Sequence, residues 1–417
     1  MPFPTLFKNL MQRRLFSWRI EVKRFSIFII LLALLAAGMP LSAQEATCVQ
    51  DYDPATDYFP DKAEITHASG LEIEYHGNYK IVRTLTPFPG AESAFEYVLV
   101  MCGTPAPDDV SQNAQIVEVP IDKAITLTTT MLPHLAETGA LDSLVGLDSF
   151  TYVNTPAVQE MIASDQLVEV GFGSGVNVEI VIASEADVVF TYGYDPSTDA
   201  HPVLLEAGIP TAITGEWLET SPLGRAEWIK FSAVFFNREA EANAAFDEMV
   251  TEYENLSGLA SGIPDDERPL VLPNFFSTTD QAWNLPGENA YFAGLLRDAG
   301  ARIVMGDVEE VQDKSGSVAF SFETVYEAGL DADIWIPNAF AVDTIDNLLA
   351  LDERYADFSA IEAGTVWNNN ARVNENGGND YWESGVTHPH LLLADLIAIF
   401  HPELLPDHEL VYFKNLQ

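Results

Sequence analysis

The pattern of apolar and polar positions divides the main body of the chain into alternating strands and helices. The stretch AITLTTTMLPHLAETGALDSLVGLDSF (124–150) predicts a buried strand, a threonine-rich turn, a helix and a second strand. Similar units recur along the chain at 176–194, 201–215, 269–277, 288–306 and 322–340. Strands that alternate with helices indicate parallel sheets in an α/β layer fold. We therefore expect two α/β lobes, 121–221 and 263–417.

A helical segment at residues 222–262 joins the two predicted lobes. Its beginning, SPLGRAEWIKF (221–231), places a proline where a first helical turn tolerates it. Asn237 is expected to cap the next helix, whose apolar face is formed by Phe246, Met249, Val250, Tyr253 and Leu256. From Asn237 to Leu256 this helix would span on the order of 30 Å. We therefore expect one stiff helix to cross between the lobes.

The first 44 residues have the layout of a secretory signal peptide. Lys23 and Arg24 precede an apolar run from Phe25 to Ala37, and small residues follow it. The run is shorter than the ~20 residues that a transmembrane helix needs. We expect cleavage after Ala43 and export of the rest of the chain. Retention of the segment as an uncleaved anchor is the alternative.

Residues 45–120 are predicted to form a β-rich extension that packs on the first lobe. Two strand-like stretches, 70–85 and 95–102, are separated by turn formers. The extension contains both cysteines of the chain, Cys48 and Cys102. An isolated pair in an oxidising compartment favours a disulfide. A lipid on Cys48 is the alternative, but the preceding residues lack the apolar and small residues of a lipid-attachment motif.

The charge of the chain is strongly negative, with 20 basic and 63 acidic residues and a net charge of −43. Removal of residues 1–44 leaves 14 basic and 62 acidic residues. Such a field repels the phosphates of nucleic acids and anionic membrane surfaces. The sequence therefore argues against a nucleic-acid partner. It also leaves few cations for a strongly anionic ligand, although Arg225 and Arg372 are candidates.

The linking segment resembles that of a known family of receptors. SPLGRAEWIKF together with NREAEANAAFDEMVTEYENL (237–256) resembles the linker of the ABC-transporter substrate-binding proteins for iron–siderophore complexes, haem and cobalamin. Further segments are similar to parts of the same family in the same order: 125–147, NVEIVIASEADVVFTYG (177–193), FSFETVYEAGLDADIWIP (320–337) and GVTHPHLLLADLIAIFHPELLP (385–406). The resemblance begins near residue 121, so it says nothing about the role of residues 45–120.

The resemblance implies a receptor and not an enzyme. It implies two parallel-sheet sandwich lobes joined by one long helix, with the ligand held in the cleft between them. The expected ligand is an iron–siderophore complex, cobalamin or haem, and the expected partner is the ABC permease of the inner membrane. A monomer on the periplasmic or extracellular face of the membrane, with no cofactor of its own, completes this expectation.

Candidate ligand contacts follow the predicted strands, since ligands of open α/β sheets bind beyond the carboxyl ends of the strands. Aromatic side chains there would suit a large, partly apolar ligand. Tyr192, Tyr194, Trp217 and Trp283 are the strongest candidates because they are predicted to lie in polar turns. The remaining candidates are Thr129, Thr130, Tyr152, Phe276, Phe340, Trp367 and Arg372.

Two glutamates stand where the family has its permease contacts. Glu179 and Glu323 each lie just inside a predicted helix start, one in each lobe. The first turn of a helix favours a carboxylate, because the helix macrodipole is positive there. The resemblance therefore implies that these two side chains pair with arginines of the permease.

Other functions are weaker alternatives. The glycine-rich GFGSGVN (171–177) fits neither a dinucleotide-binding fingerprint nor a nucleophile elbow, and a turn into a helix capped by Asn177 explains it. A receptor for bare zinc or manganese would need several converging ligands. His134 could face the cleft, whereas His388, His390, His401 and His408 surround the last helix. A non-transport extracellular binding protein is the remaining alternative.

Overall fold

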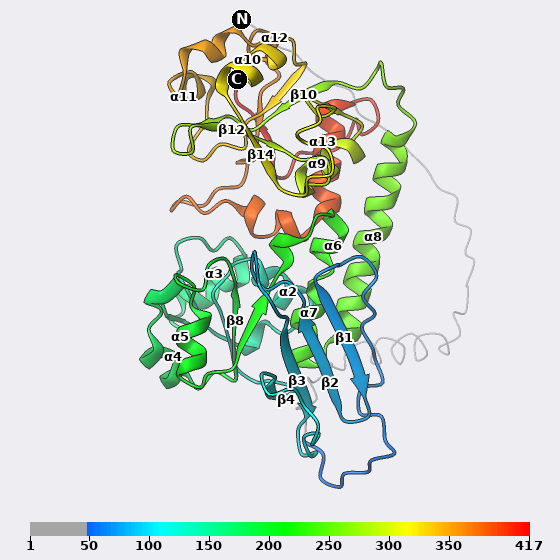
Figure 1. Cartoon of the computed structure of the whole chain (residues 1–417), viewed down its shortest axis with the longest axis vertical. Helices are drawn as coiled ribbons and strands as arrows, with labels where there is room; N and C mark the ends of the chain where they lie inside the picture. The colour runs from blue at the N-terminus through cyan, green and yellow to red at the C-terminus, as the bar shows by residue number, and fades with distance from the viewer. Residues whose placement is uncertain (1–47) are drawn as a thin grey trace, which may run out of the picture. The chain divides into compact units, whose positions relative to one another are not determined.

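The structure, a computed structural model, describes residues 48–417 (Figure 1). The predicted signal peptide at 1–44 lies outside the described residues. Within 48–417, no helix has both the length and the apolar composition needed to cross a membrane.

A four-stranded sheet precedes the lobes. Its strands are, in order across the sheet, β1 (Leu71–His76), β2 (Tyr79–Thr84), β3 (Phe95–Met101) and β4 (Gln115–Val119) (Figure 1). β2 runs antiparallel to both β1 and β3, and β4 is parallel to β3. Val82, Tyr97 and Leu99 of this sheet belong to the same buried core as the first lobe. Shared burial of apolar side chains therefore holds the extension against that lobe.

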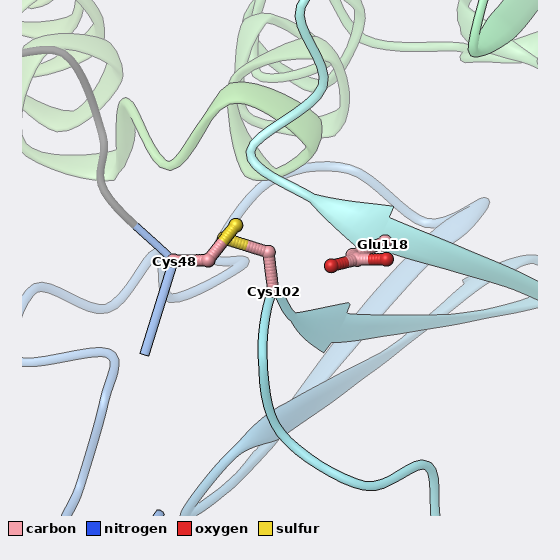
Figure 2. A group of neighbouring side chains, drawn as sticks. All are labelled: Cys48, Cys102 and Glu118. Atoms are coloured by element: carbon pink, nitrogen blue, oxygen red, sulfur yellow. A yellow bond between two sulfur atoms is a disulfide. The ribbon is translucent and has the colours of Figure 1, made fainter. Parts of the chain in front are cut away.

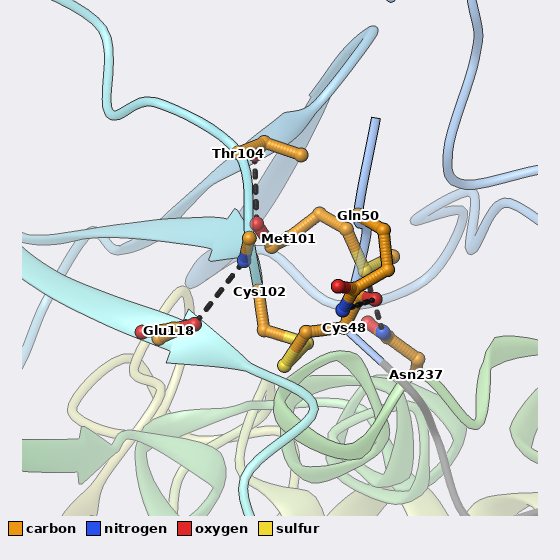
Figure 3. Close-up of a disulfide and its surroundings, with 8 residues drawn as sticks. Cys48, Gln50, Met101, Cys102, Thr104, Glu118 and Asn237 are labelled. Atoms are coloured by element: carbon orange, nitrogen blue, oxygen red, sulfur yellow. Dashed lines mark hydrogen bonds between the residues drawn. A yellow bond between two sulfur atoms is a disulfide. The ribbon is translucent and has the colours of Figure 1, made fainter. Parts of the chain in front are cut away.

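Cys48 and Cys102 form a disulfide, as the sequence predicted. It joins the start of the described chain to the end of β3, and the backbone N–H of Val49 donates to the Cys102 carbonyl at 2.9 Å. Figure 3 shows Asn237 and Met101 beside the bond. Glu118 also lies close to the two sulfurs (Figure 2). Because these sulfurs are bonded to each other, they are not free thiolate ligands, and the trio is no metal site.

Lobe one is built on a five-stranded parallel sheet with the order β7-β6-β5-β8-β9. The strands are β5 (Ala124–Thr126), β6 (Leu144–Leu147), β7 (Val168–Glu169), β8 (Val188–Tyr192) and β9 (Thr211–Thr214). The helices between them are α2 (Met131–Glu137), α3 (Pro156–Ala163), α4 (Val178–Ser184) and α5 (His201–Glu206). Every residue of β5 and β9 is buried, as expected for a parallel sheet covered on both faces.

Three helices connect the lobes: α6 (Pro222–Ala226), α7 (Ile229–Phe236) and α8 (Glu239–Ser261). The side chain of Ser221 caps α6, and all eight residues of α7 are buried. The prediction that Asn237 caps the long helix is wrong. Asn237 instead ends α7 in the left-handed conformation, with φ of 52°, which asparagine tolerates better than most residues. The long helix starts two residues later, at Glu239.

Lobe two divides its strands among three small sheets. A parallel sheet has the order β13-β10-β15, and an antiparallel sheet has the order β11-β12-β14. The strands are β10 (Leu270–Pro273), β11 (Phe276–Ser277), β12 (Ala282–Pro286), β13 (Arg302–Ile303), β14 (Ser317–Phe320), β15 (Ile334–Ile336) and the β16 (Trp367–Asn368) and β17 (Lys414–Asn415) pair. The helices are α9 (Tyr291–Asp298), α10 (Phe322–Gly329), α11 (Ile345–Leu349), α12 (Ser359–Ala363) and α13 (Pro389–Phe400). Helix α13 packs against α8, so the last helix contacts the connecting helix.

Two buried carboxylates, Glu219 at the end of lobe one and Glu227 in the connecting segment, fasten the loop before β1. Glu227 has no exposed surface and accepts hydrogen bonds from the backbone N–H groups of residues 66–68. Glu219 accepts hydrogen bonds from the backbone N–H groups of residues 69 and 70. Burial works to raise the pKa of Glu227, but hydrogen bonds from the loop and from Lys230 outweigh it and hold the pKa below its ordinary value. The extension is thus attached to the connecting segment by hydrogen bonds as well as by apolar packing.

Candidate functional site

Three neighbouring parallel strands of lobe one end at a cavity that also contacts lobe two. Thr130 follows β5, Tyr192 ends β8, and Glu216 follows β9. On the other side lies Trp382 of a short 3-10 helix, Asp380–Trp382, in lobe two. The cavity of 310 Å³ is lined by Thr128, Thr130, Tyr192, Tyr194, Glu216, Trp217, Arg225 and Trp382. It therefore occupies the position beyond the carboxyl ends of the strands where α/β proteins bind ligands.

Two further hollows continue this cavity along lobe one. A hollow of 660 Å³ shares Tyr192 and Tyr194 with it and extends to the glycine-rich turn at 171–175. A hollow of 360 Å³ shares Phe172 with the second and reaches Asp148. As predicted, Asn177 caps the helix after this turn, because its side chain accepts a hydrogen bond from the Ile180 N–H. The three hollows together provide room for a ligand larger than a single ion.

Exposed aromatic side chains gather around these hollows. Phe172 is 68% exposed, Tyr194 is 65% exposed and Trp382 is 40% exposed. Phe340, which is 73% exposed, stacks on Trp382 with ring centres 6.5 Å apart. Clustered exposed apolar side chains of this kind are typical of binding sites, whereas single exposed apolar residues are common on any protein surface. Both lobes thus contribute aromatic surface to the same region.

Polar groups at the floor of the cavity are arranged around Glu216. This carboxylate is buried and accepts hydrogen bonds from the hydroxyls of Thr130 at 3.0 Å and Thr214 at 2.7 Å. Arg225 also lines the cavity, and its guanidinium lies 5.3 Å from the ring centre of Tyr291. Among residues 48–417, neither Nε of Arg225 nor Nε1 of Trp217 has a hydrogen-bond partner. The cavity is therefore lined by one buried carboxylate and by two residues that each carry a buried donor without a partner in the part of the chain that the structure describes.

His134 does not face the cleft. It is fully buried on α2, and neither ring nitrogen has a hydrogen-bond partner among the described residues. Burial lowers its pKa from 6.5 to about 4, although the charge of Glu216 opposes this shift, and Arg225 and His388 reinforce it. The histidine is therefore neutral at pH 7, and its protonation in acid would destabilise the folded state.

The protein should lose stability in acid through His134. The unfolded chain binds a proton near pH 6.5, whereas the folded chain binds it only near pH 4. The contribution is fully present above pH 6.5 and is lost as the pH falls towards 4, and about 2 kcal/mol should be lost by pH 5. Urea unfolding at pH 7 and pH 5 would show a smaller acid loss for His134→Leu, whereas His76→Gln, a half-buried histidine of β1, should match the wild type. Equal acid losses in all three proteins would contradict this role.

Five of the predicted ligand contacts lie around the cleft. Thr130, Tyr192, Tyr194 and Trp217 line the same cavity, and Phe340 stacks on one of its walls. Tyr152 is 55% exposed on the loop before α3. The backbone carbonyl of Tyr152 lies next to Gly378 of lobe two. Thr129 belongs to the turn after β5 but does not line the cavity. Trp382, Phe172 and Glu216 were not predicted, since nothing local in the sequence distinguishes them from core or surface residues.

Four predicted contacts lie elsewhere. Trp283 is fully buried, and its Nε1–H donates to the Pro273 carbonyl at 3.0 Å, so the prediction that it lies in a polar turn is wrong. The reason is that β12 pairs on both sides, which places this ring in the core of lobe two. Phe276 packs on Phe322 of the same core. Trp367 packs against the core around α13, and Arg372 is paired with the buried Asp380 at 3.0 Å.

A segment of lobe two, residues 371–388, reaches lobe one beside the cleft (orange in Figure 1). Glu383 is 1% exposed and accepts hydrogen bonds from the backbone N–H groups of Asn154 at 2.7 Å and Thr155 at 2.6 Å. Thr155 precedes α3, whose first turn has no capping side chain of its own. Asn374 donates to the carbonyls of Thr151 and Val153 at 3.1 Å each. The cleft is therefore bordered by direct contacts between the lobes as well as by the connecting helices.

A separate cavity of 440 Å³ lies within lobe two. Arg268, Arg297 and Arg302 line it, together with apolar residues of β10, α9 and β13. All of its lining residues lie between 268 and 328. Because no residue of lobe one lines this cavity, it is not a site between the lobes.

Comparison with known proteins adds a family and relatives to this geometry. The profile of the family described as "Periplasmic binding protein" matches residues 125–370. An uncharacterized lipoprotein of Methanocaldococcus jannaschii is 24% identical over 332 residues, which cover 77% of this chain and 80% of the relative. An ABC transporter substrate-binding protein from Listeria monocytogenes is similar in structure, with a TM-score of 0.50, 17% identity, and coverage of 67% of this chain and 99% of that one.

A further solved structure is similar at the same level. It is a possible iron-binding (periplasmic solute-binding) protein from Staphylococcus epidermidis, with a TM-score of 0.51, 14% identity, and coverage of 68% of this chain and 99% of that one. At 14% and 17% sequence identity, the similarity to these two structures shows a shared fold. The predicted fold class, α/β lobes with parallel sheets on either side of a connecting helix, is thereby confirmed.

Proposed function

This chain belongs to the periplasmic binding protein family, and we propose that it is an exported receptor that captures an iron–siderophore complex, or a related haem or cobalamin ligand. The family comprises substrate-binding proteins of ABC importers, and the chain is such a protein and not an enzyme. The proposed ligand class is supported by the solved relative from Staphylococcus epidermidis, which is described as a possible iron-binding protein. Delivery of the ligand to a membrane permease is the corresponding physiological role.

The observation that carries this proposal is the aromatic cleft between the lobes. Tyr192, Tyr194 and Trp217 of lobe one share a cavity with Trp382 of lobe two. Flat aromatic surfaces suit a macrocycle or a chelate, which buries large apolar faces on binding. Among residues 48–417, no histidine lines the three hollows of the cleft. The lining therefore favours a chelated ligand over a bare metal ion.

Export of the receptor is part of the proposal. The Methanocaldococcus jannaschii relative is described as a lipoprotein. In this chain Cys48 is bonded to Cys102, and these are its two cysteines, so the disulfide-bonded form has no cysteine sulfur left for a lipid. A disulfide suits an oxidising compartment outside the cytoplasm. We place the protein on the periplasmic or extracellular face of the membrane.

The proposed function is tested by ligand binding. Protein purified from its native source would be examined by absorption spectroscopy, since haem, corrinoids and ferric chelates all absorb visible light. Haem, a ferric hydroxamate and cobalamin would then be titrated into ligand-free protein. Trp217→Ala and Trp382→Ala should each weaken binding of the preferred ligand by about ten- to a hundredfold, as expected for central aromatic contacts. Tyr52→Ala, an exposed aromatic residue outside the cleft, is the matched control. Failure of all three ligands to bind would refute the proposal.

Docking to the permease is proposed to use Glu179 and Glu323. Both side chains are exposed at the second residue of a helix, α4 in lobe one and α10 in lobe two. Glu323 lies 3.7 Å from Arg354, which is itself 47% exposed, so a permease arginine would have to compete with it. Charges at the rim of an interface mainly govern the rate of association and the orientation of the partners.

The double variant Glu179→Ala, Glu323→Ala is expected to bind ligand as the wild type does but to deliver it poorly. Two exposed charge pairs of about 1 kcal/mol each would weaken docking roughly tenfold or more. Binding to permease in proteoliposomes and ligand uptake would be measured at low and high salt. Glu160→Ala with Glu327→Ala, two other exposed helix carboxylates, serves as the control. Normal transport by the double variant, or loss of ligand binding, would show that the assignment is wrong.

A further inference from the structure

Two histidines and three glutamates surround a small cavity on the side of the connecting helix. Glu137 ends α2 of lobe one, Glu248 and Glu252 lie on α8, and His388 and His390 stand at the start of α13 in lobe two. All five line a cavity of 300 Å³, together with Ala245 and Met249. None of them lines the hollows of the ligand cleft. The cluster is thus a separate feature, to which all three parts of the fold contribute.

His388 is oriented as a metal ligand would be. Its Nδ1 lies 2.7 Å from the Ser384 carbonyl, so Nδ1 carries the proton and donates it there. That hydrogen bond leaves Nε2 directed at the Glu137 carboxylate, with which it is in contact. Metal-binding histidines commonly donate their second ring N–H to a backbone carbonyl, which fixes the tautomer and the ring orientation.

Two other polar atoms of the cluster are buried and unused. His390 is 9% exposed, and its Nδ1 has no hydrogen-bond partner among the described residues, nor has Oε2 of Glu137. Nε2 of His390 lies 3.5 Å from Glu252, which is longer than a normal hydrogen bond. Buried polar atoms without partners are costly and call for an explanation. Both atoms belong to residues that line the cavity.

The spacing of the two rings fits a shared ion. The ring centres of His388 and His390 are 5.8 Å apart. Two imidazoles that bind one zinc ion at ~2.0–2.1 Å, with a near-tetrahedral to somewhat wider angle, have ring centres about 5–6 Å apart. In the structure the side chains form two pairs, His388 with Glu137 and His390 with Glu252. No three of these ligand atoms lie within 4.8 Å of one another in the structure, so binding of one ion requires the side chains to change rotamer.

We propose that this cluster is a binding site for a divalent transition metal ion such as Zn²⁺, with His388, His390, Glu137 and Glu252 as its ligands. Imidazole nitrogen combined with carboxylate oxygen is a donor set typical of zinc. The ion joins α2 of lobe one, the connecting helix α8 and α13 of lobe two. Its occupancy therefore limits how far the lobes move relative to each other, at a distance from the ligand cleft. The site does not depend on which ligand the cleft binds.

The test is zinc binding by the full-length chain after removal of metals with a chelator. Isothermal titration with Zn²⁺ should show one site per chain with a dissociation constant in the micromolar range or below. Co²⁺ at the same site should give the visible absorption of tetrahedral coordination. The double variant His388→Gln, His390→Gln should lose at least about a hundredfold in affinity, and Glu137→Gln about tenfold or more. Because the chain has 63 acidic residues, weak background binding is measured on the double variant and subtracted.

His76→Gln is the matched control, because His76 lies half-buried beside Glu74 in the extension and outside the cluster. It should bind Zn²⁺ as the wild type does. Thermal unfolding of each metal-free variant verifies that the variant is folded. If the double histidine variant does not fold, Glu137→Gln tests the site independently. Absence of a one-to-one zinc site in the wild type, or wild-type affinity in the folded variants, would overturn the proposal.

Discussion

Replacement of Lys80 by methionine is expected to lower the free energy of unfolding by about 3–5 kcal/mol. Lys80 lies on β2 of the extension and is fully buried. Its Nζ donates to Glu239 at 2.6 Å, to the Val234 carbonyl at 2.6 Å and to Asn237 at 2.8 Å. Methionine keeps the apolar stem but leaves a buried carboxylate without its cation, and burial of an unpaired charge is costly.

The measurement is urea unfolding at pH 7, with Lys62→Met as the control. Lys62 pairs with Asp57 at 2.7 Å, but both side chains are largely exposed, at 40% and 54%. Exposed pairs contribute about 1 kcal/mol or less, so this variant should be close to the wild type. Since Glu239 begins α8, a large effect of Lys80→Met would also mean that the extension stabilises the start of the connecting helix. Similar small losses in both variants would contradict this account.

Glu383→Ala is expected to destabilise the contact between the lobes by about 3 kcal/mol. The variant removes the acceptor for two backbone N–H groups and for the Thr155 hydroxyl, which donates at 2.6 Å. Hydrogen bonds to a buried charged group contribute about 1.5–3 kcal/mol each, and loss of a helix N-cap costs about 1 kcal/mol. The same hydrogen bonds cap α3, so the two contributions are not added in full. Because donor and acceptor belong to different lobes, the variant should open the cleft more readily.

Opening would be followed by spin labels on α4 and α10 and by limited proteolysis of the loop before α3. Glu375→Ala is the matched control, since Glu375 is exposed in the same segment of lobe two. The control should leave the distance between the labels and the rate of cleavage unchanged. If Glu383→Ala left both unchanged as well, residues 371–388 would not hold the lobes together.

The order of strands and helices could be predicted from the sequence because periodicity is local. Buried runs such as β5 and β8 alternate with short amphipathic helices, and this alternation predicts parallel sheets without any knowledge of contacts. The Cys48–Cys102 disulfide was also predictable, since a chain with two cysteines leaves one possible intramolecular pairing. In the cleft, Tyr192 and Trp217 were predictable because they follow strands that end at one edge of a sheet.

Contacts between distant parts of the chain were decided by the tertiary structure. Trp283 follows a polar stretch, and only the pairing of β12 with β11 and β14 places it in the core. Glu383 and Thr155 are 228 residues apart, and no local pattern relates them. The same holds for Trp382 in the cleft and for Glu137 beside His388. A sequence pattern records which face of an element is apolar, whereas the partner of a buried polar group depends on how the elements pack, and the sequence alone therefore left these sites undetermined.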